Sequence, residues 1–143
     1  MQENTSLLLI EDHPDIAAMV CDYFEERGYI IDYAADGVTG LHLAVSNDFD
    51  AIILDLMLPG MDGIETLTTI KAKHPLVEVI MLTGHATVES AIEGMKLGAF
   101  DYLMKPCDLD VLVEKVDEAA KKKREQDEKI IAARMNAITQ RTA

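Results

Sequence analysis

The sequence contains no tryptophan, only two cysteines and no apolar run long enough to span a bilayer. Cys21 and Cys107 are too few for a disulfide framework, and neither falls at zinc-ligand spacing from a histidine. The amino terminus lacks the basic segment of a signal peptide, and acidic Glu11 directly follows the short apolar run at residues 7–10. These absences predict a soluble, cytoplasmic protein with no membrane partner.

Basic residues are scarce through most of the chain. Residues 1–108 carry 19 acidic and 5 basic side chains, a net charge of −14, whereas residues 109–143 carry 7 acidic and 8 basic ones. Because so acidic a body repels nucleic acid, we expect no direct nucleic-acid binding. The one basic run, at residues 121–124, is surrounded by acids at helical i,i+4 spacing, which favours a solvated helix face.

Four short runs rich in Ile, Leu, Val and Met each lead into a polar residue. The runs cover residues 7–10, 51–54, 79–82 and 102–104, and the polar residues are Asp12, Asp55, Thr83 and Lys105. Segments with apolar residues at helical spacing separate the runs, and a further strand is predicted at residues 29–34. Five strands and five helices in strict alternation, in a chain of 143 residues, predict one α/β domain with a parallel sheet.

The carboxyl ends of parallel strands form one shared crevice, so these polar side chains are expected to meet there. Three carboxylates, those of Glu11, Asp12 and Asp55, would repel one another and raise one another's pKa. A hard cation such as Mg²⁺ relieves this repulsion, and the ammonium of Lys105 suits a phosphate oxygen. A carboxylate in such a setting can attack phosphorus and form an acyl phosphate.

Each of these residues also has an ordinary explanation when it is taken alone. Aspartate at a strand end is commonly a turn former or a helix cap, and the dipeptides Thr83-Gly84 and Lys105-Pro106 are common in loops. Their joint placement after the first, third, fourth and fifth strands is what favours function.

The motifs in this order resemble those of receiver domains of two-component response regulators. The matching residues are Glu11-Asp12, residues 55–63 (DLMLPGMDG), Thr83-Gly84 and residues 98–106 (GAFDYLMKP). The resemblance covers roughly residues 6–120. Within it, the motif sequence at residues 83–106 is most similar to that of the receivers of nitrogen-regulation-type activators. It implies a flavodoxin-like, doubly wound (βα)5 fold with strand order 2-1-3-4-5, here with an extended C-terminal helix.

The resemblance also implies a phosphorylation site. Asp55 would accept a phosphoryl group from a sensor histidine kinase or from a small phosphodonor. Mg²⁺ would be held by Asp12, Asp55 and the backbone carbonyl of Met57, with Glu11 acting directly or through water. Met57 and His85 stand at the positions that tune the dephosphorylation rate in this family.

Four further residues have implied roles in binding and switching. Lys105 and Thr83 would contact the phosphoryl group, and the bond between Lys105 and Pro106 would be cis. Thr83 and Tyr102 would move on phosphorylation and so change the face formed by the fourth helix (about residues 87–98), the fifth strand (residues 102–104) and the fifth helix (from residue 108), the helix 4–strand 5–helix 5 face.

Two enzymatic or cofactor-binding alternatives are less favoured. A Mg²⁺-dependent aspartyl-phosphate phosphohydrolase would carry a second aspartate as general acid where this chain has the apolar Met57. A flavin-binding module of the same fold would need a Ser/Thr-rich phosphate loop after the first strand, which is absent. We therefore expect a phosphoacceptor signalling domain that assists its own phosphorylation and dephosphorylation and is not otherwise an enzyme.

The carboxyl-terminal segment separates from this pattern. We expect a receiver domain at residues 1–120 and a helical extension or linker at residues 121–143, where a polar stretch precedes apolar residues at helical spacing. Those apolar residues are Ile130, Ile131, Met135 and Ile138. A homodimer could form through this helix or through the helix 4–strand 5–helix 5 face. A stand-alone receiver is favoured over the alternative, the receiver fragment of a longer transcriptional regulator.

Overall fold

The computed structural model describes residues 4–58, 62–84 and 88–142. Strands and helices alternate along this part of the chain, as predicted. The elements are β1 (Ser6–Ile10), α1 (Pro14–Glu25), β2 (Ile30–Ala34), α2 (Gly37–Ser46), β3 (Ala51–Leu54), α3 (Gly63–Lys73), β4 (Glu78–Thr83), α4 (Val88–Lys96), β5 (Asp101–Met104) and α5 (Leu109–Thr142).

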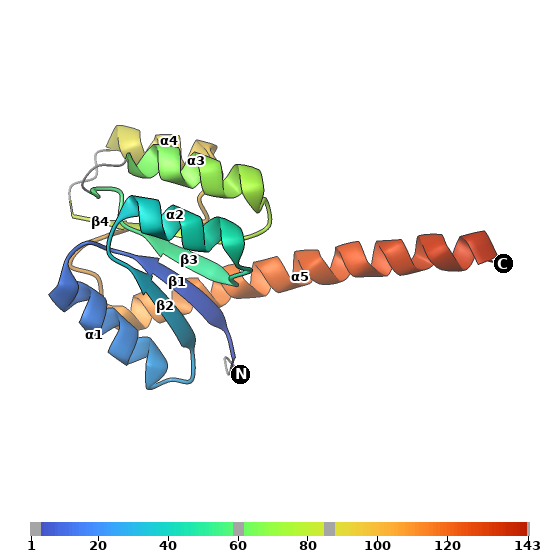
Figure 1. Cartoon of the computed structure of the whole chain (residues 1–143), viewed down its shortest axis with the longest axis horizontal. Helices are drawn as coiled ribbons and strands as arrows, with labels where there is room; N and C mark the ends of the chain where they lie inside the picture. Colours follow the sequence, from blue (N-terminus) through green and yellow to red (C-terminus); the bar gives the residue numbers. More distant parts are fainter. Residues whose placement is uncertain (1–3, 59–61, 85–87, 143) are drawn as a thin grey trace.

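The five strands form one parallel sheet in the order β2-β1-β3-β4-β5, which confirms the predicted doubly wound fold. Helices α1 and α5 cover one face, and α2, α3 and α4 cover the other (Figure 1). Alternate residues of β1 supply the two cores. Leu9 belongs to a cluster with Val20 of α1 and Val116 of α5, whereas Leu8 belongs to a cluster with Leu67 of α3.

The three inner strands are buried on both faces, which is why they read as continuous apolar runs. Strand β4 is one residue longer at each end than its apolar run predicts, because it begins at Glu78 and ends at Thr83. Both of these polar residues are buried. Strand β2 lies at an edge of the sheet and is largely exposed.

Two helices end shortly before a glycine. Helix α1 ends at Glu25, before Gly28, and α4 ends at Lys96, before Gly98. Both glycines have positive φ, 89° and 106°. Glycine adopts this conformation without a steric penalty, so these two positions allow the chain to leave the helix and turn toward the next strand.

Helix α5 is the longest element, with 34 residues, and it continues without interruption past Ala120. Its end projects well beyond the sheet (Figure 1). All side chains from residue 128 to residue 141 are exposed. In the described part of the chain, no helix combines the length and the apolar character needed to cross a bilayer.

The basic run at residues 121–124 differs from the expected solvated helix face. Lys123 is only 6% exposed, and its ammonium pairs with Asp48 and Asp127. The reason is that this part of α5 still lies against the amino-terminal edge of the sheet. Helical periodicity alone could not show that Asp48, which lies outside α5, is placed next to Lys123.

Candidate functional site

The carboxyl-terminal ends of four strands bring the predicted site residues to one place. Glu11 follows β1, Asp55 follows β3, Thr83 ends β4 and Lys105 follows β5. Backbone bonds continue the sheet into these positions: the Asp55 amide donates to the Ile10 carbonyl at 3.0 Å, and the Lys105 amide donates to the Thr83 carbonyl at 2.9 Å. The sheet therefore fixes the directions in which these side chains leave the backbone.

The Lys105 ammonium lies between two carboxylates. Its Nζ is 2.5 Å from Glu11 Oε1 and 3.1 Å from Asp55 Oδ2. The second oxygen of each carboxylate accepts a backbone amide: His13 donates to Glu11 at 3.1 Å and Met57 donates to Asp55 at 2.9 Å. The Glu11 side chain is 1% exposed and that of Asp55 6%, so solvent screens these charges weakly.

Burial raises the pKa of the Glu11 carboxyl, and the charge of Asp55 adds to this effect. Hydrogen bonds from Lys105 and from the His13 amide oppose it without cancelling it. For Lys105, burial alone would lower the pKa, but the hydrogen bonds and charges of Glu11 and Asp55 outweigh burial, so the pKa of this ammonium is raised. The site therefore favours the charged form of Lys105 and disfavours the charged form of Glu11.

Asp12 completes an acidic cluster with Glu11 and Asp55. Each residue offers one carboxylate oxygen, and these oxygens lie within 4.8 Å of one another. Asp12 is exposed while the other two are buried, so the cluster opens to solvent on one side. Hard oxygen donors with a solvent-facing side fit Mg²⁺, which binds through one or two carboxylates and keeps several waters.

The structure describes all but one of the remaining predicted site residues. Thr83 is fully buried, and the Lys105–Pro106 peptide bond is cis. Tyr102 lies in β5, is partly buried, and its hydroxyl donates to Met104 Sδ at 3.0 Å. The Met57 side chain, 57% exposed, lies at the surface beside the cluster. His85 lies outside the described residues.

Sequence reasoning missed the role of Gly63, the first residue of α3. A Cβ at this position would lie 2.6 Å from the backbone of Leu56, immediately after Asp55. Glycine is therefore required for the start of α3 to approach the loop that follows the buried carboxylate. Its position next to Asp62, which caps α3, is the sequence signal that could have pointed to this contact.

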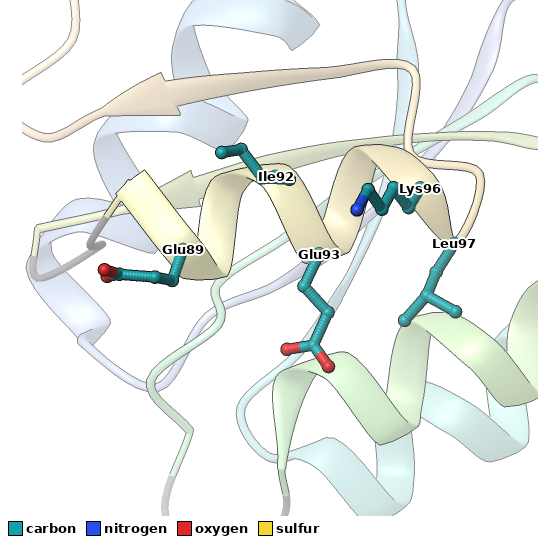
Figure 2. A pocket seen from close by; sticks show the side chains of 5 residues that line it. All are labelled: Glu89, Ile92, Glu93, Lys96 and Leu97. Carbon is teal, nitrogen blue, oxygen red and sulfur yellow. The ribbon is translucent and has the colours of Figure 1, made fainter.

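Two surface depressions were also missed, because neither has a sequence motif. An apolar pocket with a volume of about 270 Å³ lies between α1 and α5. Its lining consists of Ile16, Met19, Val20, Leu82, Lys105, Pro106, Cys107, Leu109 and Leu112. A shallow depression of about 480 Å³ lies along α4 and is lined by Glu89, Ile92, Glu93 and Lys96 of the helix and by Leu97, which directly follows it (Figure 2). Glu93 and Leu97 point to the α3 side of the helix, and Ile92 points away from it.

Known proteins resemble this chain in both sequence and fold. Residues 7–117 match the response regulator receiver domain family. The chain is 41% identical over 110 residues to the transcriptional activator protein IrlR of Burkholderia pseudomallei, covering 77% of this chain and 48% of that protein. It is 35% identical over 124 residues to a putative response regulator NtrX-like of Rickettsia bellii, covering 83% of this chain and 26% of that protein.

Among solved structures, a CheY-like response regulator receiver domain from Methanospirillum hungatei JF-1 superimposes with a TM-score of 0.83 and 28% identity. The match covers 87% of this chain and 99% of that one. By contrast, the chain spans about half or less of the length of the two curated relatives above. The chain belongs to the response regulator receiver domains of two-component signal transduction.

Proposed function

We propose that Asp55 accepts the phosphoryl group from a phosphohistidine of a sensor histidine kinase. A carboxylate oxygen of Asp55 attacks phosphorus, the phosphorus–nitrogen bond breaks, and the imidazole keeps the bonding electron pair. The observation that carries this proposal is the contact of buried Asp55 with Lys105, 3.1 Å away, inside a cluster of three carboxylates. After transfer, the negative charge lies on the phosphoryl oxygens, and the Lys105 ammonium can pair with them instead of with the carboxylate.

The acidic cluster is proposed to bind Mg²⁺ through Asp12, Asp55 and the Met57 carbonyl, with Glu11, which pairs with Lys105, acting directly or through water. When bound, the ion neutralises charge on the transferring phosphoryl oxygens. The chain's own part is to hold the carboxylates in place through the amides of His13 and Met57.

Switching is proposed to start at Thr83 and Tyr102. The Thr83 hydroxyl would bind a phosphoryl oxygen, and the movement would free space that Tyr102 can enter. Tyr102 starts from a partly exposed position, with its hydroxyl bound to Met104 rather than fixed in a buried network. Phosphorylation adds up to two negative charges, and a few kcal/mol of differential stabilisation are enough to invert such a two-state population.

The output is proposed to be a protein contact. The face of α4 and β5 includes exposed Ile92 and Met95, and α5 exposes Ile131 and Met135, so either could pair two copies. Because IrlR is a transcriptional activator and both curated relatives are longer than this chain, the alternative proposal is a receiver that controls an attached output domain. The acidic body disfavours nucleic-acid contacts by the receiver itself.

Met57 and His85 are proposed to tune the lifetime of the phosphoryl group on Asp55.

The test is the intact mass of the protein after incubation with acetyl phosphate, with and without Mg²⁺. We expect a gain of one phosphoryl group that requires Mg²⁺ and is lost in Asp55→Asn. Asp15→Asn is the matched control, because Asp15 is an exposed aspartate in the first turn of α1. Labelling that persists in Asp55→Asn would refute the assignment, and absence of labelling calls for the same comparison with a phosphohistidine donor.

A further inference from the structure

Helix α5 crosses the amino-terminal edge of the sheet before it leaves the domain (Figure 1). There, Lys122, Lys123 and Arg124 contact acidic or polar residues of three separate segments of the body. We name residues 122–127 the clamp and the helical segment 128–142 the rod. None of these contacts involves the acidic cluster at the other edge.

Lys123 is the most buried residue of the clamp, with 6% of its surface exposed. Its Nζ lies 3.1 Å from Asp48 Oδ1, in the connection between α2 and β3, and 3.0 Å from Asp127 Oδ2 on its own helix. A lysine this deeply buried is seldom tolerated without partners, so the two carboxylates fix where its side chain lies.

Lys122 contacts a second segment. Its Nζ lies 2.8 Å from Glu78 Oε2, at the start of β4, and Glu78 is 5% exposed. The other oxygen of Glu78 lies 3.4 Å from Lys71 Nζ of α3, which also donates to the Pro75 carbonyl at 2.8 Å. Glu78 therefore links α5 to β4 and to the end of α3.

Arg124 contacts the third segment. Its guanidinium donates to Thr5 Oγ1 at 2.7 Å and lies 3.7 Å from Asp50 Oδ2. Thr5 is fully buried, and Asp50 accepts the Ser6 amide at 2.8 Å, so both partners are fixed at the start of β1. The partners of Arg124 are thus part of the sheet edge itself.

Successive residues on an α-helix point about 100° apart, so three consecutive side chains cover more than half of its circumference. Contacts made over that arc to three segments oppose both rotation of the helix about its axis and tilting away from the sheet. A helix of the length of the rod is marginal alone in water, so its helical form depends on continuation from a fixed turn.

We propose that the clamp fixes the direction of the rod relative to the sheet, so that α5 acts as one rigid arm. A second copy that binds the rod is presented at a constant angle to the receiver body. The rod moves only when the body moves, and the clamp is the place where this coupling can be removed without touching the phosphorylation site.

Amide residual dipolar couplings of the full chain test the proposal, because amides on one rigid body share one alignment tensor. In the wild type and in Lys121→Met, which changes an exposed neighbour, couplings of residues 128–138 should fit the tensor of the sheet. In Lys123→Met they should fall to about half while those of the sheet stay unchanged. Light scattering under the same conditions keeps the comparison to one oligomeric state.

Asp48→Asn should likewise reduce the couplings of residues 128–138, because it removes the carboxylate that pairs with Lys123. The Asp48 side chain is 79% exposed, so this substitution leaves the core intact. The proposal is overturned if the wild-type rod couplings are already averaged, or if they stay on the tensor of the sheet when Lys122, Lys123 and Arg124 are all replaced by methionine. Either outcome can be read in unphosphorylated protein, so it does not depend on Asp55 being the phosphoacceptor.

Discussion

The amino-terminal and carboxyl-terminal ends of the strands both carry ion pairs, but the two sets serve different purposes. At the carboxyl-terminal edge, three carboxylates share the ammonium of Lys105. At the amino-terminal edge, the basic residues of the clamp each meet at least one carboxylate. The first edge has an excess of negative charge and the second is close to neutral.

This difference separates a binding site from a structural contact. Carboxylates without enough positive charge nearby repel one another and destabilise the folded protein. A cation that binds there relieves this repulsion, and the relief contributes to its binding free energy. Balanced charges satisfy one another, and among the described residues no buried side-chain nitrogen or oxygen lacks a hydrogen-bond partner. The predictions below test whether the balance of charge, rather than burial, distinguishes the two edges.

Lys105→Met should give the largest effect, a loss of about 3 kcal/mol in the free energy of unfolding in metal-free buffer near neutral pH. The substitution leaves Glu11 and Asp55 buried without a cation, and the already raised pKa of Glu11 would rise further. Urea unfolding measures the loss. Lys96→Met on exposed α4 is the control, and equal stability of the two variants would show that the acidic cluster is not strained.

Mg²⁺ should reverse the imbalance at the carboxyl-terminal edge. At a concentration about 100 times its dissociation constant, a ligand that binds only folded protein stabilises it by about 2.7 kcal/mol. We expect this gain in the wild type and in Lys123→Met, whose change lies at the other edge. Thermal unfolding at increasing Mg²⁺ concentrations measures it.

Asp12→Asn sharpens the same test, because it removes one carboxylate of the cluster and keeps the side-chain volume. Without metal, this variant should be as stable as the wild type or slightly more stable, since repulsion is reduced. With Mg²⁺ it should gain at least about 1.4 kcal/mol less, corresponding to about tenfold weaker binding. An unchanged gain would mean that the ion is held elsewhere.

The contrast between the edges also explains what could be predicted from sequence. The site at the carboxyl-terminal edge could be predicted because residues that follow the strands of a parallel sheet lie at the same edge. Glu11, Asp55 and Lys105 could therefore be placed together before their distances were known. The alternation of strands and helices likewise predicted a parallel α/β sheet, whereas the strand order 2-1-3-4-5 was implied by the resemblance to receiver domains. Residues whose role depends on precise approach, such as Gly63 against the Leu56 backbone, leave no comparable signal.

The clamp was not predictable for a different reason. The partners of Lys123 are Asp48, in a loop, and Asp127, one turn away on the same helix. Periodicity recognises only the second kind of pair, and it suggested solvated i,i+4 pairs for the whole run at residues 121–124. Where a helix passes the edge of a sheet depends on tertiary packing, so local pattern could not separate buried Lys123 from exposed Lys121.

The smallest expected effect lies at the amino-terminal edge. Lys123→Met should cost about 1 kcal/mol near neutral pH, less than Lys105→Met, because Asp48 is 79% exposed and water can solvate it once its partner is gone. Lys121→Met, at an exposed position of the same helical turn, should cost almost nothing. Equal losses for Lys123→Met and Lys105→Met would remove the distinction between balanced and unbalanced edges.

The dependence of this loss on pH separates the charge of Lys123 from its packing. Burial alone would lower the pKa of this ammonium, but Asp127 and Asp48 outweigh burial and raise it above the ordinary value of 10.5. A raised pKa means that the folded state holds the proton more tightly, so the stabilisation is complete below pH 10.5 and is lost as pH rises through the folded-state pKa. The difference in unfolding free energy between the wild type and Lys123→Met should therefore shrink in that alkaline range, while the effects of ionising tyrosines cancel between the two proteins. A difference that stays constant would assign the stabilisation to the aliphatic stem of the lysine and not to its ion pairs.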